Sequence, residues 1–373
     1  MMEKSEQEIS GIFCIIDLDI AGLLDQLLEE SGLQEVYIQR AKQMSLASRL
    51  RTPFMRPVTV LSESRALIYR MYVPSEYEEG LMAKIAETAD LKMGGRGSIF
   101  SQKLKIQRGE PFSFDYEKLE NLCGRQDKNH SDESVLISCI VSRGSGASIA
   151  RAMLEIGLCV PVIFFGSGMG FREKLGLLRI AIPVEKEIIW FIVPKNDAVL
   201  AEKFLIPKAH SDIRGQGYIY QSNIHAPAVN LRIRESRRIY AASMEQVINA
   251  IDEVRGSSDW RRLGAHDDRR SLKQAETRGF FFMGSEEEVD IFRRTALDNG
   301  AGGATVSPLQ MQAYGEEPGQ ANESRSRQLC EIIITPGTEE KLEKAVRKTG
   351  LLDDGKTCIL KTFNTQTPEA GKN

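Results

Sequence analysis

The sequence predicts an α+β fold made of three tandem ferredoxin-like (βαββαβ) units with antiparallel sheets, arranged as an intramolecular pseudo-trimer. Two observations predict this fold. First, three stretches of the 373-residue chain repeat the order strand, helix, strand, strand, helix, strand, which is the order of the ferredoxin-like unit. Second, landmarks recur at one spacing, because Pro74 lies 23 residues before Gly97 and Pro194 lies 23 residues before Gly217.

The first unit spans residues 10–108. Apolar runs predict its strands, and apolar residues at helical spacing predict its helices. The expected elements are a strand at Ile12–Ile16, a helix from Ile20 to near Gly32, a strand that starts at Val36–Ile38, a strand that starts at Ala66–Val73, a helix that includes Leu81–Ile85 and a strand from Ile99.

The second and third units span residues 134–234 and 278–365. In the second we expect strands at Val135–Val141, Val160–Phe165, Glu187–Val193 and Tyr218–Tyr220, with helices at Ile149–Ile156 and Asp197–Phe204. In the third we expect strands at Gly279–Met283, Ala304–Met311, Leu329–Thr335 and Thr357–Leu360, with helices at Glu286–Asn299 and Thr338–Thr349. A proline ends the third strand of each unit, where it can open the next helix without losing a hydrogen bond.

Two helices cover only one face of such a sheet, so each unit needs a partner for the other face. Runs such as Ile188–Val193 are apolar on both faces. Three units in one chain can bury these faces against one another, so we expect a monomer that acts as a pseudo-trimer. Residues 109–133 and 235–277 are expected to be linkers, the second with a short helix, and residues 366–373 a tail.

Composition narrows the functional classes. The net charge of -3 offers no overall basic field for nucleic acid. The apolar runs are short, so no membrane insertion is expected, and the N-terminus lacks the pattern of a secretory signal. Six cysteines are scattered without a C-x-x-C pair, which favours a reduced, cytoplasmic protein.

Most catalytic and metal-site patterns can be set aside. Residues Gly350–Thr357 match the phosphate-loop pattern G-x-x-x-x-G-K-T, but the order is inverted, because a helix is expected before it and a strand after it. The four histidines stand alone, without zinc-site spacing. We therefore predict no catalytic residues, no metal site and no enzyme.

Three glycine-containing segments are the remaining candidates for a binding site. They are Gly166, Gly168 and Gly170 at a strand end, Gly95-Arg96-Gly97, and Gly215 with Gly217. Each can be read simply as a turn between a helix and a strand. Alternatively, glycines let backbone N–H groups crowd around an anion. Their recurrence beside the expected clefts between units leaves the two interpretations about equal.

The second unit resembles the nitrogen-regulatory P-II signalling proteins, and especially their divergent P-II-like relatives. The resemblance rests on Val141–Gly144, Phe165–Gly170, Val184–Ile188 with Ile192–Pro194, Gly215–Tyr220 and Leu231–Arg234. The first unit shares Gly95–Phe100, and the third keeps Asp354-Gly355-Lys356. The chain departs from the family pattern at two positions. The lysine of the family's G-x-G-K turn is replaced by Ser98 in the first unit and by Tyr218 in the second.

The resemblance implies a signalling protein with enzyme regulator activity that binds a small effector between units and regulates a partner protein, in the regulation of nitrogen utilization. The effector would be an adenine nucleotide (ATP, ADP or AMP), with no required cofactor. The implied ligand-binding residues are Gly166, Gly168, Gly170, Lys174, Gly215, Gly217, Arg232, Arg234, Gly95, Arg96, Gly97, Gly355 and Lys356. The alternative is a structural or protein-interaction module whose clefts have lost their ligand.

Overall fold

A computed structural model describes residues 8–49, 58–125, 134–170, 184–209, 217–230, 232–235, 250–252, 254–256, 274–314 and 325–368. In the first third of the chain, the helices and strands lie where the apolar pattern predicts them, and several run further. They are β1 (Ile9–Asp17), α1 (Ala21–Glu30), β2 (Glu35–Arg49), β3 (Val58–Pro74), α2 (Glu78–Thr88) and β4 (Gly97–Gln102).

The second and third thirds repeat this order. The second contains β6 (Ser134–Ser142), α4 (Gly146–Ile156), β7 (Val162–Gly170), β8 (Val184–Pro194), α5 (Ala198–Ala209) and β9 (Gly217–Ala228). The third contains β11 (Gln274–Gly284), α8 (Glu286–Asp298), β12 (Gly303–Ala313), β13 (Ser326–Ile334), α9 (Glu339–Arg347) and β14 (Ile359–Pro368). Pro74 and Pro194 each cap a short 3-10 turn that leads into the following helix.

The strands of all three thirds join into one sheet. Its order is β10-β2-β3-β1-β4-β9-β6-β8-β7-β12-β13-β11-β14-β5, where β5 is Lys105–Arg108 and β10 is Arg234–Glu235. Within each third the first strand lies between the third and the fourth, as β1 does between β3 and β4. Additional pairings of β2 with β7 and β12, and of β9 with β14, close the sheet on itself.

This closure corrects the predicted fold class. We expected three ferredoxin-like units, each with a sheet of its own, held together as a pseudo-trimer. The structure instead has a single sheet that closes into a barrel, with backbone pairing across the boundaries between thirds. For example, Gln43 of β2 pairs with Val162 of β7, and Gln310 of β12 pairs with Ile38 of β2. An unpaired strand edge is costly, and these pairings remove several such edges.

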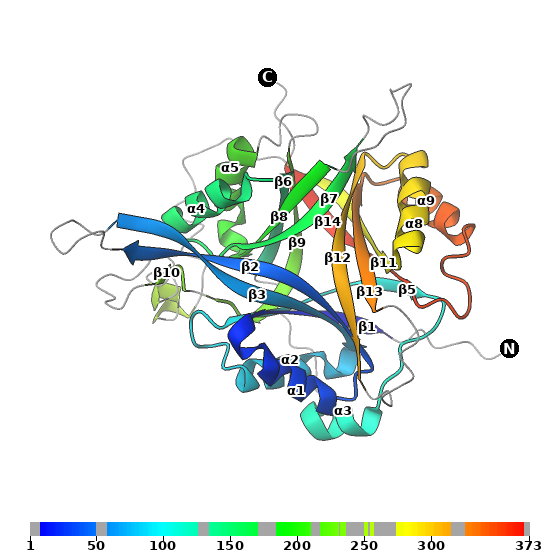
Figure 1. Cartoon of the computed structure of the whole chain (residues 1–373), viewed down its shortest axis with the longest axis horizontal. Helices are drawn as coiled ribbons and strands as arrows, with labels where there is room; N and C mark the ends of the chain where they lie inside the picture. Colours follow the sequence, from blue (N-terminus) through cyan, green and yellow to red (C-terminus); the bar gives the residue numbers. More distant parts are fainter. Residues whose placement is uncertain are drawn as a thin grey trace.

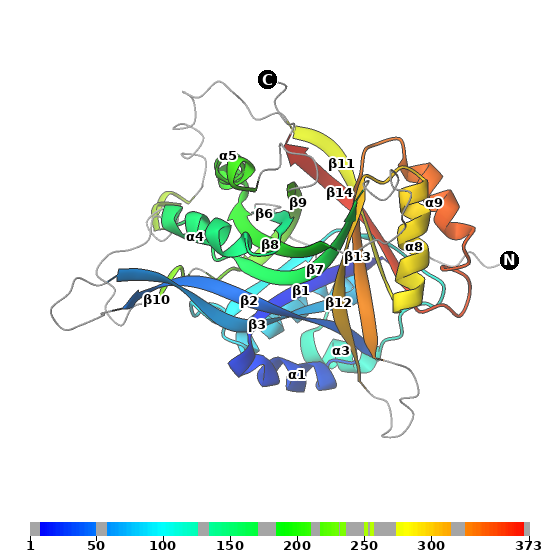
Figure 2. The ribbon, with the colours of Figure 1, turned by 45° about the horizontal axis from the view of Figure 1, so that its top comes forward.

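The helices lie in three groups outside the sheet, with α1 and α2, α4 and α5, and α8 and α9 as neighbours (Figures 1 and 2). Each group covers an apolar cluster of its own. A fourth cluster fills the centre, with contributions from all three thirds that include Phe13, Phe100, Phe164, Trp190, Tyr220 and Phe281.

The structure of strand β1 explains why its residues Ile12–Ile16 are all apolar. Alternate side chains of a strand point to opposite faces. Ile12, Cys14 and Ile16 belong to the outer cluster under the helices, whereas Phe13 and Ile15 belong to the central cluster. Since both faces of the strand are buried, the apolar run has no polar alternation.

The connecting segments differ from the expected linkers. Residues 109–133 contain a helix, α3 (Tyr116–Cys123), which buries Leu119 in the outer cluster with α1 and α2. Asp115 caps this helix by accepting a hydrogen bond from the Lys118 N–H at 3.1 Å, a local signal that the sequence analysis missed. The expected tail, residues 366–373, starts inside β14, and residues 274–277 of the expected second linker belong to β11.

One buried carboxylate predicts how stability depends on pH. Glu202 of α5 is fully buried in the structure and accepts a hydrogen bond from the Gln274 side chain. Burial raises the pKa of Glu202 from 4.5 to about 7, although the hydrogen bond from Gln274 opposes the shift. The folded state therefore favours the neutral acid, and ionisation at higher pH costs stability.

We expect Glu202→Gln to have nearly the wild-type free energy of unfolding at pH 4.5 and to be more stable by about 1–3 kcal/mol at pH 8. The gain should develop between pH 4.5 and 7, where the unfolded carboxyl has ionised and the folded one has not. Urea titrations at both pH values measure it. Glu340→Gln, at a largely exposed position of α9, is the control, and an equal gain at both pH values would refute the prediction.

Candidate functional site: a pocket between β4 and β14

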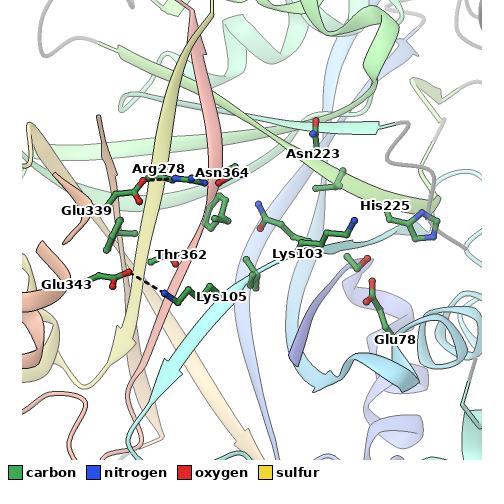
Figure 3. A pocket seen from close by; sticks show the side chains of 16 residues that line it. Glu78, Lys103, Lys105, Asn223, His225, Arg278, Glu339, Glu343, Thr362 and Asn364 are labelled. Carbon is green, nitrogen blue, oxygen red and sulfur yellow. Dashed lines mark hydrogen bonds and ion pairs between the residues drawn. The ribbon is translucent and has the colours of Figure 1, made fainter. Parts of the chain in front are cut away.

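A pocket of about 550 Å³ lies where the sheet is not fully paired. Strand β9 pairs with β4 through Ile99 and Ser101 and with β14 through Gln366, but no pairing joins β4 to β14 among the described strands. Side chains from all three thirds line the space between them (Figure 3). They are Glu78, Ser101, Gln102, Lys103, Leu104, Lys105, Asn223, Ile224, His225, Arg278, Phe280, Glu339, Glu343, Thr362, Phe363 and Asn364.

The chain that leaves β4 crosses this gap. Strand β4 ends at Gln102, and after Lys103 and Leu104 the chain pairs with β14 as β5, with Lys105 opposite Thr362. The segment therefore links the first third of the chain to the last along one wall of the pocket. Charged and apolar side chains alternate along this segment, as expected for a strand with one face buried and the other exposed to solvent.

Helix α9 supplies the acidic wall. Glu339 and Glu343 are four residues apart, so they lie on one face of the helix. Glu339 accepts a hydrogen bond from Arg278 Nε at 2.5 Å, and Glu343 lies 3.9 Å from Lys105 Nζ. The second pair is long and its lysine is 68% exposed, so it contributes little to stability and leaves Glu343 able to exchange partners.

The opposite side of the pocket carries Lys103 and His225. Figure 3 shows both on the side away from Glu339 and Glu343, with Glu78 near His225. His225 Nε2 lies 3.2 Å from Glu79 Oε1. Glu78, the first residue of α2, accepts a hydrogen bond from Ser10 Oγ at 2.5 Å. Both sides of the pocket therefore carry acidic and basic side chains.

The remaining lining is apolar or carries amide groups. Leu104, Ile224, Phe280 and Phe363 provide apolar surface, and Asn223, Asn364 and Gln102 provide amides that both donate and accept hydrogen bonds. A few convergent polar groups on an apolar floor, in a space of 300–1,000 Å³, are typical of small-molecule sites. The arrangement is suited to binding and orienting a small polar molecule.

None of the predicted ligand-binding residues that the structure describes lines this pocket. Gly166, Gly168 and Gly170 form the end of strand β7 rather than a loop. Gly166 and Gly168 pair with Lys186 and Val184 of β8, and Gly168 and Gly170 pair with residues of β12. Their backbone is therefore part of the sheet on both sides.

Two of the predicted residues do meet. The Gly95 N–H donates to Asn230 Oδ1 at 2.8 Å, and the Arg232 N–H donates to the same oxygen at 3.0 Å. A Cβ atom at Gly95 would lie 2.8 Å from Arg232 Cδ, and at Gly97 it would lie 2.0 Å from the Ile15 carbonyl oxygen. Close packing therefore accounts for these glycines, and Arg96 next to them donates to the Ala89 carbonyl at 3.2 Å.

The other predicted positions lie apart. Gly217 begins β9, and a Cβ there would lie 2.0 Å from the Ala209 carbonyl oxygen. Gly355, with φ +81°, and Lys356 lie in the turn between α9 and β14, where the Lys356 carbonyl accepts a hydrogen bond from the Glu110 N–H at 2.9 Å. Lys174 and Gly215 lie outside the described residues, and of Arg234 only the backbone in β10 is described.

The described part of the chain gives little support for a metal site or for a reactive cysteine. It contains no group of three or more His, Cys, Asp or Glu residues that could hold a metal ion. None of the six cysteines, all of which the structure describes, forms a disulfide bond, and five of them are buried. Burial raises the pKa of Cys14 and of Cys139 to about 12, which keeps both thiols protonated. No helix in the described ranges is both long and apolar enough to span a membrane.

Comparisons with known proteins give no family. No protein family and no curated protein matches the chain. A solved structure described as a crystal structure study of an anthrone oxidase-like protein has a TM-score of 0.17 and 7% identity, covering 62% of this chain and 98% of that one. A likeness at that TM-score carries no argument about fold or function.

These findings correct the predicted family. The assignment to the P-II-like proteins is contradicted, because no family match supports it and the strands close into a single barrel. Nucleotide binding, enzyme regulator activity and regulation of nitrogen utilization were inferred from that resemblance, and they lose their basis with it.

Proposed function

We propose that the chain is a binding protein for a small zwitterionic metabolite of amino-acid or dipeptide size, which occupies the pocket between β4 and β14. The proposal rests on the side chains of both charges that line this one pocket. Lys103 and His225 lie on one side with Glu78, and Glu339 and Glu343 lie on the other with Arg278 and Lys105. A ligand with an acidic and a basic group can use both kinds of side chain, whereas a ligand with one charge can use only one kind.

The polar contacts already present are consistent with an exchangeable site. Lys105 and Glu343 are held at 3.9 Å in a largely solvated pair, so a ligand ammonium that contacts Glu343 displaces only a weak interaction. Charge-assisted hydrogen bonds to a ligand carboxylate or ammonium are worth more, about 1.5–3 kcal/mol each. The amides of Asn223 and Asn364 can serve either end of the ligand.

A regulatory role follows from the position of the pocket. The ligand would touch the segment after β4, the middle of β9, and α9 with β14, and so would tie together three parts of the chain that are distant in sequence. A ligand that binds more tightly when these three parts are held together increases the population of that conformation. A partner protein that binds this conformation preferentially would then respond to the ligand. As part of this proposal we place the protein in the reducing cytoplasm, since its cysteines are free.

Thermal-shift and calorimetric titrations with amino acids, ω-amino acids and dipeptides test the proposal. Each compound is compared with an amidated analogue that lacks the acid and an acetylated analogue that lacks the amine. We expect binding only when both charges are present. Failure of every compound to bind would favour the alternative, a protein-interaction module without a ligand.

Matched variants locate the site. Glu343→Gln and Lys103→Gln should each weaken binding about tenfold or more, because each removes a charged contact. Glu340 lies on the same helix but outside the pocket lining, and its side chain is 88% exposed. The Glu340→Gln variant should therefore bind the ligand as the wild type does. Equal effects of Glu343→Gln and Glu340→Gln would refute the assignment of the pocket.

A further inference from the structure

A second, much smaller cavity lies behind the pocket, inside the barrel. Its volume is about 10 Å³, which is the room that one water-sized particle needs. Gln102, Leu104 and Phe363 line both the pocket and this cavity, so they form the wall between the two. The rest of the lining is mostly aromatic and includes Phe13, Trp190, Tyr220 and Phe281.

Two buried cationic residues also line the cavity. Arg70 of β3 and Lys361 of β14 are each about 1% exposed. Arg70 Cζ lies 5.0 Å from the centre of the Trp190 ring, and Lys361 Nζ lies 5.4 Å from that of Tyr72. The ring faces of aromatic residues attract cations, but they do not supply a full counter-charge.

One buried carboxylate faces these two cations. Glu331 of β13 is 3% exposed, and its charge interacts with both Arg70 and Lys361. Burial raises the pKa of Glu331 to about 7, so below that pH the carboxyl is neutral and Arg70 has no counter-charge from it. Burial also lowers the pKa of Lys361 well below its ordinary value, and Arg70 adds to the shift. An anion beside Lys361 would oppose both effects and favour the ammonium form.

Hydrogen-bond donors at the cavity lack acceptors. Among the described residues, Arg70 Nε and Trp190 Nε1 are buried N–H groups without a hydrogen-bond partner, while Arg70 Nη2 donates to Gln39 Oε1 at 2.5 Å. A buried donor that lacks an acceptor is costly. Both unsatisfied groups belong to residues that line the same small cavity.

We propose that this cavity binds a single monatomic anion, a halide ion, held by Arg70, Lys361 and the indole N–H of Trp190. The ion would supply the missing acceptor for two donors and balance the excess positive charge. The size of the cavity excludes a carboxylate or phosphate group. The two sites share only part of their lining and differ in the residues that would hold the ligand and in the ligand itself, so either proposal can fail without the other.

Crystals of the wild-type protein grown with sodium bromide provide the direct test. We expect one anomalous bromide peak inside the barrel, within contact distance of Arg70, Lys361 and Trp190. A water molecule at that place without anomalous signal, or bromide found only on the outer surface, would overturn the proposal. This experiment needs no variant, so it does not depend on the folding of a mutant.

Tryptophan emission gives a solution test. The chain has two tryptophans, so a Trp260→Phe background leaves Trp190 as the reporter. We expect bromide, the ion used in the crystals, but not the larger sulfate at equal ionic strength, to change the emission with saturation. Lys361→Met should weaken this response at least tenfold, and Lys42→Met, at a 43% exposed lysine, should leave it unchanged. A purely linear response, or an unchanged response in Lys361→Met, would contradict the site.

Discussion

Replacing Glu331 with leucine is expected to lower the free energy of unfolding by about 3–5 kcal/mol, measured by urea denaturation in halide-free buffer. Glu331 is buried in the centre of the barrel, where its charge interacts with Arg70 and Lys361. Without the carboxylate, Arg70 stays charged in a region that excludes water, and Lys361 must either stay charged there or lose its proton. Burying a charge without a counter-charge is among the most costly changes in a protein core.

A second substitution separates lost charge from lost packing. Lys361→Met in the Glu331→Leu background removes one of the two remaining basic groups and keeps a side chain of similar length. We expect the double variant to recover at least half of the stability that Glu331→Leu loses. Strictly additive losses would show that Glu331 and Lys361 do not interact, contrary to this description of the core.

Replacing Trp190 with alanine is expected to cost about 3–5 kcal/mol. Trp190 of β8 makes edge contacts with Phe13, Phe100 and Phe164, at ring-centre distances of 6.2, 6.0 and 5.0 Å. Phe13 and Phe100 belong to the first third of the chain, and Trp190 and Phe164 belong to the second. The variant therefore opens a cavity at the junction that holds these two thirds together.

Circular dichroism should follow this unfolding, since the substitution removes the main fluorescent reporter. Phe204→Ala is the control, because Phe204 lies on the outer surface of α5 with 38% of its area exposed, and the expected loss is below about 1 kcal/mol. Similar losses in the two variants would contradict the placement of Trp190 in a shared core.

The individual helices and strands could be predicted from the sequence because their signals are local. In β1 both faces are buried, so the run Ile12–Ile16 is apolar without interruption. In α8 the capping box of Ser285 and Glu288 marks the start of the helix. Such signals need only a few neighbouring residues.

The closure of the sheet could not be predicted in the same way. We expected a second strand that starts at residues 36–38, but its length was not apparent from the sequence, and β2 continues to Arg49. Its later residues mix buried apolar side chains, such as Met44 and Leu46, with polar ones, and the side-chain oxygen of the buried Gln43 accepts a hydrogen bond from Asn230 at 2.6 Å. A buried glutamine that bonds to a residue 187 positions away leaves no local pattern, so the pairings of β2 with β7 and β12 were missed.

The pocket was missed for a related reason. Lys103, His225 and Glu343 come from three distant segments, and each looks like an ordinary surface residue in its own sequence context. The glycine segments drew attention instead, because glycine is conspicuous in sequence. At Gly97 and Gly217, however, a Cβ atom would meet a backbone carbonyl oxygen at 2.0 Å, which is a sufficient reason for glycine in a tightly packed sheet.

Hydrogen exchange with and without the bound zwitterion, followed by mass spectrometry, tests most directly whether the pocket between β4 and β14 is the binding site. We expect slower exchange on binding in two segments at once, residues 103–108 after β4 and residues 339–347 of α9, because the ligand contacts both walls. Residues 21–30 of α1 lie on the outside and should not change. Unchanged exchange in both segments under saturating ligand, or protection confined to other parts of the chain, would contradict this assignment of the binding site.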